Sequence, residues 1–324
     1  MEREWRLSLD EAALAAVVYA DLFDFPLTAR EIHRGLIGRS ASDDVVQDTI
    51  HRLLATGRLA IDRAFYVIPD RAGLALLREE RTRRAARLWP VARRFGQFLA
   101  IMPFVRAVIV SGSLAVGNPD PAADVDFLLI TAPGRLWLVR AIAILIVRFA
   151  RLTGAQICPN YLLSTQALVL AQRDLFTAHE LLQTVPLSGH EVYSRLRAAN
   201  LWTATWLPNW PGADGAFPTE PSLRGRPVAF GQRLGEAVLG GFVGDRFERW
   251  EGIRKRQRLQ PLASDARFSA DVCEGHFGRH RERITRRFAE RCAQVGISEP
   301  QLAASLDSVS PGPTVSVNLA VTGT

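Results

Sequence analysis

Apolar and polar positions in the first seventy residues alternate first with the period of helices and then with that of short strands. This alternation predicts three helices and two strands, at residues 9–25, 28–37, 42–55, 59–61 and 65–67. Thr28 and Glu31 form a capping box at the start of the second helix, just after Pro26 has ended the first. Three helices followed by a β-ribbon predict a winged-helix module over residues 1–72.

A long helix and then a run of buried-strand segments follow this module. The helix is predicted over residues 73–102 and connects the module to a segment at residues 103–210. Within that segment, apolar runs predict three strands and helical spacing predicts three helices, at residues 105–110, 124–130 and 156–163 and at residues 134–152, 174–185 and 191–206. This alternation predicts an α/β domain with a small mixed sheet.

The last third of the chain has a different pattern. Proline and glycine gather in residues 211–227, which we interpret as a linker. Residues 228–298 have helical spacing with a break at 261–267, and we expect a helical C-terminal region there. Residues 299–324 are rich in Ser, Pro, Thr and Gly and are predicted to form a tail with one late strand at 315–321. The fold class predicted for the whole chain is α+β.

Composition indicates an ordinary globular protein. Hydrophobic residues make up 48% and charged residues 23% of the 324 positions, which argues against disorder and low-complexity fibre. The longest strongly apolar stretch, residues 136–150, is interrupted by Arg140 and Arg148, so we predict no membrane span and no membrane partner. The N-terminus lacks a signal-peptide pattern and the three cysteines are scattered, which together predict a cytoplasmic protein.

Charge bears on the role of the predicted winged helix. The formal net charge is +7, yet residues 1–70 contain eight arginines against twelve carboxylates. The predicted third helix presents Asp43, Asp44 and Asp48 on its polar face, and carboxylates repel the phosphates of a duplex. We therefore expect this module to contact a protein partner or the rest of the chain, with DNA binding as the less favoured alternative.

Two aspartates at the start of the second buried strand carry the clearest chemical signal. Asp124 and Asp126 are two residues apart, which places both carboxylates on one face of a strand. Such a pair can bind one or two hard cations, Mg²⁺ or Mn²⁺, together with the phosphates of a nucleotide. Gly112 lets a phosphate approach closely, and its amide and the Ser113 hydroxyl can bind phosphate oxygens.

These residues belong to a longer pattern over residues 105–131, VRAVIVSGSLAVGNPDPAADVDFLLIT. It resembles the signature of the DNA polymerase β-like nucleotidyltransferases, in which an apolar strand ends in Gly-Ser and an acid-x-acid pair lies in a second apolar strand. With the helix and strand that follow, the resemblance extends through the predicted domain at residues 103–210. The chain as a whole is similar to bacterial proteins that join an N-terminal winged helix to such a nucleotidyltransferase domain.

The resemblance implies an enzyme that uses Mg²⁺ to move a nucleoside monophosphate from an NTP to an acceptor. It makes Asp124 and Asp126 the catalytic metal ligands and Gly112 and Ser113 the nucleotide-binding loop. The acceptor is a small hydroxylated molecule, a protein side chain or an RNA end, and the sequence does not select among them.

The sequence departs from the family at a third carboxylate, which members usually carry on the strand after the helix. That predicted strand has no acid, and Asn160 or Gln156 lies where the acid is expected. Asparagine can bind a metal through oxygen but cannot accept a proton at neutral pH. Glu180 or Asp174, on the next helix, can take that position instead. If neither does, the alternative function is a nucleotide-binding regulatory protein without turnover.

Three further patterns have simpler explanations. Cys273, His276 and His280, with Cys292, are residue types that bind zinc, but their spacing is unusual and a helix with chance cysteines and histidines is favoured. The tryptophans at four-residue spacing, Trp202, Trp206 and Trp210, are expected to pack in a core rather than to stack on bases. The basic stretch at residues 245–291 is interpreted as a solvated helix face or as an edge of the active-site cleft.

Overall fold

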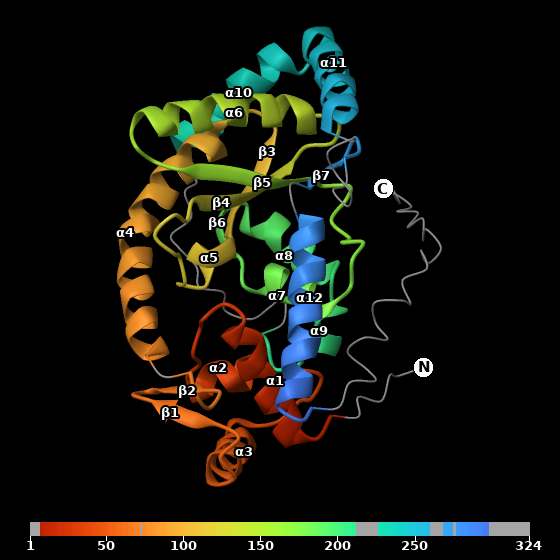
Figure 1. Ribbon diagram of the computed structural model, residues 1–324. Helices are drawn as coiled ribbons and strands as arrows, with labels where there is room; N and C mark the ends of the chain where they lie inside the picture. The colour runs from red at the N-terminus through yellow and green to blue at the C-terminus, as the bar shows by residue number, and fades with distance from the viewer. Residues whose placement is uncertain (1–6, 72, 212–225, 260–267, 275–276, 298–324) are drawn as a thin grey trace.

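The computed structural model describes residues 7–71, 73–211, 226–259, 268–274 and 277–297. Together these residues form an α+β fold with twelve helices, a two-stranded sheet and a five-stranded mixed sheet. Figure 1 shows the N-terminal helices at one end of the molecule, the larger sheet in the middle and three helices at the other end. The predicted fold class is confirmed at this level.

The N-terminal elements follow the predicted order. They are α1 Leu9–Asp21, α2 Ala29–Arg34, α3 Asp43–Ala55, β1 Ala60–Asp62 and β2 Phe65–Val67. Capping boxes open both α1, at Ser8, and α2, at Thr28, because in each a glutamate three residues later returns a hydrogen bond to the cap. Leu27 forms an isolated antiparallel bridge with Tyr66, so the segment before α2 pairs with β2 as a third segment beside the two-stranded sheet.

The larger sheet follows the long helix α4 Leu74–Ile101, which runs along one side of the molecule from the N-terminal elements up to α6 (Figure 1). Its strands are β3 Val105–Ser111, β4 Val125–Thr131, β5 Ile157–Ser164, β6 Val185–Ser188 and β7 Val272–Glu274, in the order β6-β3-β4-β5-β7. Only β4 and β5 are parallel. The crossover between them is α6 Leu136–Leu152, as a parallel connection requires.

Helices cover both faces of this sheet. On one face, α4 and α6 bury residues such as Val110, Phe127 and Leu129. On the other, α7 Leu175–Leu182 and α8 His190–Ala198 pack against Ile109 and Leu128. The remaining helices are α5 Gly112–Ala115, α9 Thr203–Trp206, α10 Arg226–Leu239, α11 Phe242–Leu259 and α12 Phe277–Gln294. None of the described helices combines the length and the apolar character that crossing a bilayer requires.

Two strands and several boundaries correct the predictions. The helix expected to run to residue 185 ends at Leu182, and β6 follows it. β7 lies inside a region that was predicted to be wholly helical. The helix predicted over residues 191–206 is divided into α8 and α9 by a turn at Ala199 to Trp202. The predicted helix break at 261–267 and the late strand at 315–321 lie outside the described residues.

One hydrophobic core joins the N-terminal helices to the rest of the chain. Residues of α1, α2 and α3 share a buried cluster with residues of α7, α9 and α12. Tyr19 of α1 packs edge-on against Phe288 of α12 and stacks on His179 of α7, with ring centroids 5.4 and 4.0 Å apart. The N-terminal elements are therefore held against the underside of the sheet domain.

Candidate functional site

The site is built around Asp126 in β4, the middle strand of the larger sheet. Its register partners are Ser111 in β3 and Cys158 in β5. Asp124 lies just before β4, whereas the sequence predicted that it is the first residue of this strand. One ligand atom each from Asp124, Asp126 and Cys158 lie within 4.8 Å of one another. The structure thus brings together the two aspartates that the sequence paired and adds a thiol that the sequence did not single out.

Gly112 lies directly against the carboxylate of Asp126. Its φ is +65°, and a β carbon placed on it would lie 2.5 Å from Oδ2 of Asp126. Both the backbone conformation and the space therefore require glycine at this position. The bend brings the start of α5 beside the carboxylate, as the resemblance implied for the Gly-Ser pair.

Two serines flank this glycine. Ser113 is half-buried in α5, and its carbonyl oxygen accepts a hydrogen bond from the amide of Asn118, 2.8 Å away, which closes the bend. Ser111 is buried, and its hydroxyl has no hydrogen-bond partner among the described residues. The Ser111 hydroxyl beside Asp126 is therefore available to a ligand. The sequence had indicated only Ser113 as a phosphate-binding serine.

Asn160 reaches Asp126 because β5 contains a bulge. The register between β4 and β5 shifts after Phe127, which pairs with Pro159, so that Leu128 pairs with Tyr161. Nδ2 of Asn160 donates a hydrogen bond to Oδ1 of Asp126 at 3.0 Å, while Oδ1 of Asn160 is buried and accepts no hydrogen bond from the described residues. Asn160 therefore occupies the third position as an amide in direct contact with the metal-ligand candidate.

Glu180 approaches the same site from α7. It is half-buried, and its side chain lines a cavity beneath the sheet rather than the outer surface of the helix. Burial raises the pKa of Glu180 to about 7. Burial, together with the charges of Asp124 and Glu180, also raises the pKa of Asp126 to about 7. The charges of Asp124 and Glu180 thus both disfavour the ionised form of Asp126, although only Asp124 lies in the same close cluster.

The pKa of the Cys158 thiol is raised as well. Burial raises the pKa of its thiol to about 11, and the carboxylates of Asp126 and Asp124 add to this effect. The thiol is therefore protonated at neutral pH, whereas a metal-binding cysteine must be a thiolate. The oxygen donors of the two aspartates, which suit hard cations such as Mg²⁺ or Mn²⁺, are the stronger ligand candidates.

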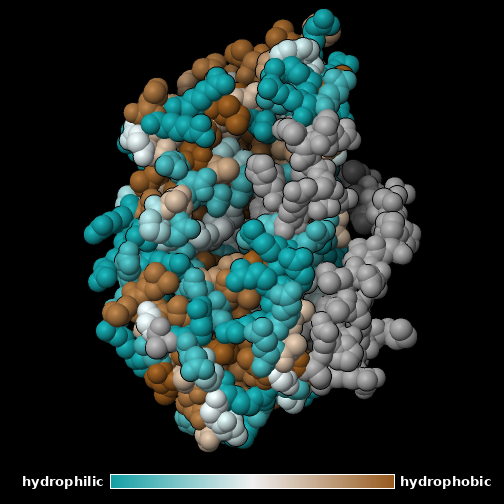
Figure 2. Space-filling view, in the orientation of Figure 1, coloured by the Kyte–Doolittle hydropathy of each residue, from teal (hydrophilic) through white to brown (hydrophobic). Residues whose placement is uncertain are grey.

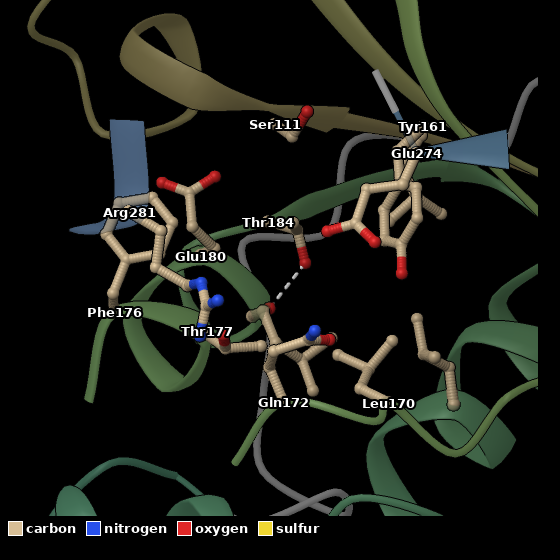
Figure 3. A pocket seen from close by; sticks show the side chains of 13 residues that line it. Ser111, Tyr161, Leu170, Gln172, Phe176, Thr177, Glu180, Thr184, Glu274 and Arg281 are labelled. Carbon is tan, nitrogen blue, oxygen red and sulfur yellow. Dashed lines mark hydrogen bonds between the residues drawn. The ribbon is translucent and has the colours of Figure 1, made fainter. Parts of the chain in front are cut away.

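A cavity of about 60 Å³ adjoins these groups on the side of α7 (Figure 3). Asp126 does not line it, but Ser111 and Glu180 do, and they connect the cavity to the carboxylate cluster. Figure 3 shows the side chains of Thr184, which lies between α7 and β6, and of Glu274 in β7 reaching toward its middle. Its floor is apolar and includes Leu128. The sequence did not predict this cavity, because the residues that line it come from seven separate segments of the chain.

The other two candidates for a third position are not part of the cluster. Asp174 is the N-cap of α7, accepting a hydrogen bond from the Thr177 amide at 2.8 Å and an ion pair from Arg281 at 2.9 Å. Gln156 is exposed, and its backbone oxygen accepts a hydrogen bond from the amide of Val125. Arg281 also lines the cavity, so the ion pair with Asp174 fixes a guanidinium at its rim.

The residues considered for zinc lie apart. Cys273 is buried in the core beneath α6, whereas Cys292 is buried in the core between α12 and α1. His280 lies edge-on to Phe176, and its Nδ1 accepts a hydrogen bond from Arg283, whereas His276 is outside the described residues. In the part of the chain that the structure describes, the Asp124–Asp126–Cys158 group is the only cluster that could hold a metal ion.

The tryptophans at residues 202, 206 and 210 pack as the sequence favoured. Trp206 is buried, and its Nε1 donates a hydrogen bond to the carbonyl oxygen of Arg173 at 2.8 Å. Trp202 and Trp210 pack against the same core as α1. None of the three lines the cavity beside Asp126.

Comparison of the chain with protein-family models, with curated proteins and with solved structures finds no match.

Proposed function

We propose that this chain is a metal-dependent nucleotidyltransferase that moves a nucleoside monophosphate from an NTP to an acceptor. The observation that carries the proposal is the seating of the Asp126 carboxylate, beside Asp124, against the left-handed bend at Gly112. In the resemblance on which the proposal rests, these two elements bind the metal and the triphosphate. The central sheet is then a nucleotidyltransferase domain, and α1 to β2 form a winged helix.

The donor atoms at the site suit Mg²⁺ or Mn²⁺. Asp124 and Asp126 provide carboxylate oxygens, and the orphaned Oδ1 of Asn160 is a further hard oxygen next to them. Burial, and to a lesser extent repulsion by Asp124 and Glu180, raises the pKa of Asp126, and a bound cation would favour its ionised form. Bound there, the cation supplies neutralisation of the charge on the phosphates.

Residues of the chain bind the triphosphate, hold the acceptor and take up its proton. Gly112 and the Ser111 and Ser113 hydroxyls bind and orient the triphosphate, and the cavity holds the acceptor. The acceptor oxygen attacks the α-phosphorus, the bond to the pyrophosphate oxygen breaks, and the proton of the acceptor passes to Glu180. With a pKa of about 7, Glu180 is a proton acceptor matched to neutral pH, which Asn160 cannot be.

One observation favours a second candidate function. The third position on β5 is an amide that already donates to Asp126, so the two aspartates bind a nucleotide without the carboxylate that family members usually place there. A regulatory protein that binds NTP and does not turn it over has the same site. The role of Glu180 separates the two functions.

Release of pyrophosphate tests the proposal. The purified chain is incubated with each labelled NTP and Mg²⁺ or Mn²⁺, alone and with cell extract as a source of acceptors. We expect release that Asp126→Asn lowers by about a hundredfold or more, since several kcal/mol of charge stabilisation are lost. Glu180→Gln is expected to lower the rate by about a hundredfold while NTP binding is kept, because only proton transfer is removed.

Asp120→Asn is the matched control, because Asp120 is an exposed carboxylate in the same loop and caps only the amide of Ala122. It should release pyrophosphate at the unmodified rate. Saturable NTP binding without release in any mixture supports the regulatory protein instead. Absence of NTP binding with both metals contradicts both functions.

We further propose that the N-terminal winged helix serves as a contact for a protein or for the rest of the chain rather than for DNA. Asp43, Asp44 and Asp48 are exposed on α3, and the exposed Arg52 is engaged by Asp10 at 2.7 Å. The polar face of the helix thus remains acidic. A gel shift with random duplex DNA at several salt concentrations checks this, and retardation that weakens with salt would contradict it.

A further inference from the structure

The helices α10 and α11, at the end of the molecule farthest from the N-terminal helices, expose a row of large apolar side chains. On α10, Phe230, Leu234 and Val238 recur every four residues and so share one face. Phe242, Val243, Trp250 and Ile253 continue the row on α11. All seven are at least half exposed, with Phe242 at 73% and Phe230 at 71%. We refer to these seven residues as the apolar stripe.

The neighbouring surface extends this stripe. Leu145, Phe149 and Leu152 of α6 are exposed as well, and Leu152 is 87% exposed. Figure 2 shows hydrophobic residues gathered along the end of the molecule where Figure 1 places α6 and α10. Scattered exposed apolar residues are ordinary on a protein surface, whereas a contiguous group of this kind marks a contact surface.

The surface around the apolar stripe is predominantly basic. Residues 226–259 contain eight basic and four acidic side chains. Every one of the four acids is engaged within the fold: Glu236 pairs with Arg106, Asp245 with Arg135, Glu251 with Arg254 and Lys255, and Glu248 accepts the amides of Trp137 and Leu138 at the start of α6. The acids therefore do not neutralise the outer surface.

The outer surface instead carries arginines between the apolar side chains. Arg233 on α10 and Arg246, Arg249 and Arg258 on α11 are exposed, and no described carboxylate pairs with them. On α11, Arg246 is four residues from both Phe242 and Trp250, and Arg249 is four residues from Ile253, so cationic and apolar groups alternate on the same face. This combination differs from the mixed-sign charge of an ordinary solvated helix.

From this pattern we propose that α10 and α11 dock the protein onto an anionic phospholipid surface. Apolar side chains, with a tryptophan among them, insert between lipid chains while the arginines bind the phosphates of the headgroups. A second copy of the chain fits this surface less well, because a symmetric contact places unpaired arginines against arginines. Such a surface lies on a bilayer and needs no spanning helix, so it is compatible with the described helices. The proposal replaces the expectation from the sequence that the protein has no membrane partner.

Sedimentation with vesicles tests this docking. The full chain is mixed with vesicles of phosphatidylcholine alone and with vesicles that also contain phosphatidylglycerol. We expect binding to the anionic vesicles to be about tenfold or more tighter, and to weaken with salt. The double variant Phe242→Ser, Trp250→Ser should lose vesicle binding and keep its fold, because both residues are exposed.

The matched control is Ile61→Ser with Leu201→Ser, two side chains that are 59% and 64% exposed away from these helices. It should sediment with vesicles like the unmodified chain. A blue shift of tryptophan fluorescence on anionic vesicles is expected to disappear in Trp250→Phe while sedimentation is retained, which locates the contact.

Three outcomes overturn the proposal. They are no binding to anionic vesicles, equal binding by the stripe variant and its control, and a dimer in light scattering that the stripe variant abolishes. The last outcome assigns the stripe to a second copy of the chain. Pyrophosphate release in solution should be the same for all of these variants, so docking and catalysis fail or succeed separately.

Discussion

At the scale of single residues, the contact between Gly112 and Asp126 shows why the motif has its spacing. The carboxylate fills the space where a side chain at residue 112 would be, and φ at that residue is positive. Gly117, in the loop that follows, also has a positive φ of +74°, but open space surrounds it. A side chain at residue 117 would therefore strain only the backbone. A side chain at residue 112 would strain the backbone and also collide with Asp126.

Replacing each glycine with alanine measures these two effects. Gly117→Ala is expected to lower the free energy of unfolding by about 1–2 kcal/mol and to leave turnover unchanged, since only the backbone is strained. Gly112→Ala should lower it by about 2–4 kcal/mol, because Asp126 must also move. Pyrophosphate release should be lost in the second variant alone. Urea unfolding and the release assay provide the two measurements, and equal losses in both variants would contradict the close-approach explanation.

At the scale of elements, the sequence predicted the pieces with strong local signals and missed those defined by distant partners. The helices of the first seventy residues and strands β3, β4 and β5 have clear periodicity or long apolar runs. β6 is four residues with Pro186 in it, which is tolerated because β6 is an edge strand bonded only to β3. β7 is three residues long and exists through its pairing with β5.

In the candidate site, too, the sequence identified the residues of one local motif and missed the positions that depend on distant partners. Asp124, Asp126, Gly112 and Ser113 lie in one continuous motif, and the sequence could identify them together. Asn160 and Glu180 could be named only as alternatives, because a bulge in β5 and the packing angle of α7 decide where their side chains point. Neither the bulge nor the angle has a local signature in the sequence.

Helix α7 also buries His179 against α1. Its ring stacks on Tyr19, and its Nε2 has no hydrogen-bond partner among the described residues. Burial lowers the pKa of His179 to about 3. Below pH 6.5 the unfolded chain binds a proton that the folded chain refuses until about pH 3. His179 therefore stabilises the fold less as the pH falls through this window.

Comparison with His179→Phe isolates this effect, since phenylalanine keeps an aromatic stack without a titratable group. Between pH 6.5 and 4.5 the unmodified chain should lose about 2 kcal/mol of unfolding free energy relative to the variant. Asp126 and Glu180, whose pKa values are raised, act in the opposite direction in both proteins and cancel in the difference. Urea unfolding at several pH values measures it, and parallel pH profiles would contradict a neutral buried histidine.

At the scale of the whole molecule, the N-terminal elements and the sheet domain are joined at two places. One is the shared core of α1, α7 and α12. The other is the loop between α5 and β4, where Asn118 donates to the carbonyl oxygen of Phe23 at 3.0 Å and accepts from Arg81 at 3.1 Å. The loop between Gly112 and Asp124 thus rests on the N-terminal elements, and we expect the described regions to unfold together.

Phe288→Ala tests this cooperativity. Phe288 is buried between α12 and α1, so its truncation should lower the unfolding free energy by about 3–4 kcal/mol. Far-ultraviolet circular dichroism and tryptophan fluorescence should report one coincident transition that moves as a whole. Arg286→Ala, an exposed position on the same helix, should change stability by less than about 0.5 kcal/mol. Two separate transitions, of which one moves, would show that the halves are independent.

The pairing of α1 with α12 has a consequence for biosynthesis. Helix α1 leaves the ribosome long before α12, which covers it, because Tyr19 and Phe288 meet in the finished fold. Until α12 is translated, the nascent chain presents the aromatic side of α1 to the cell with its native partner missing. Contacts between such distant segments also slow folding. The chain is therefore expected to rely on chaperones while it is made and to complete this core only after α12 has been translated.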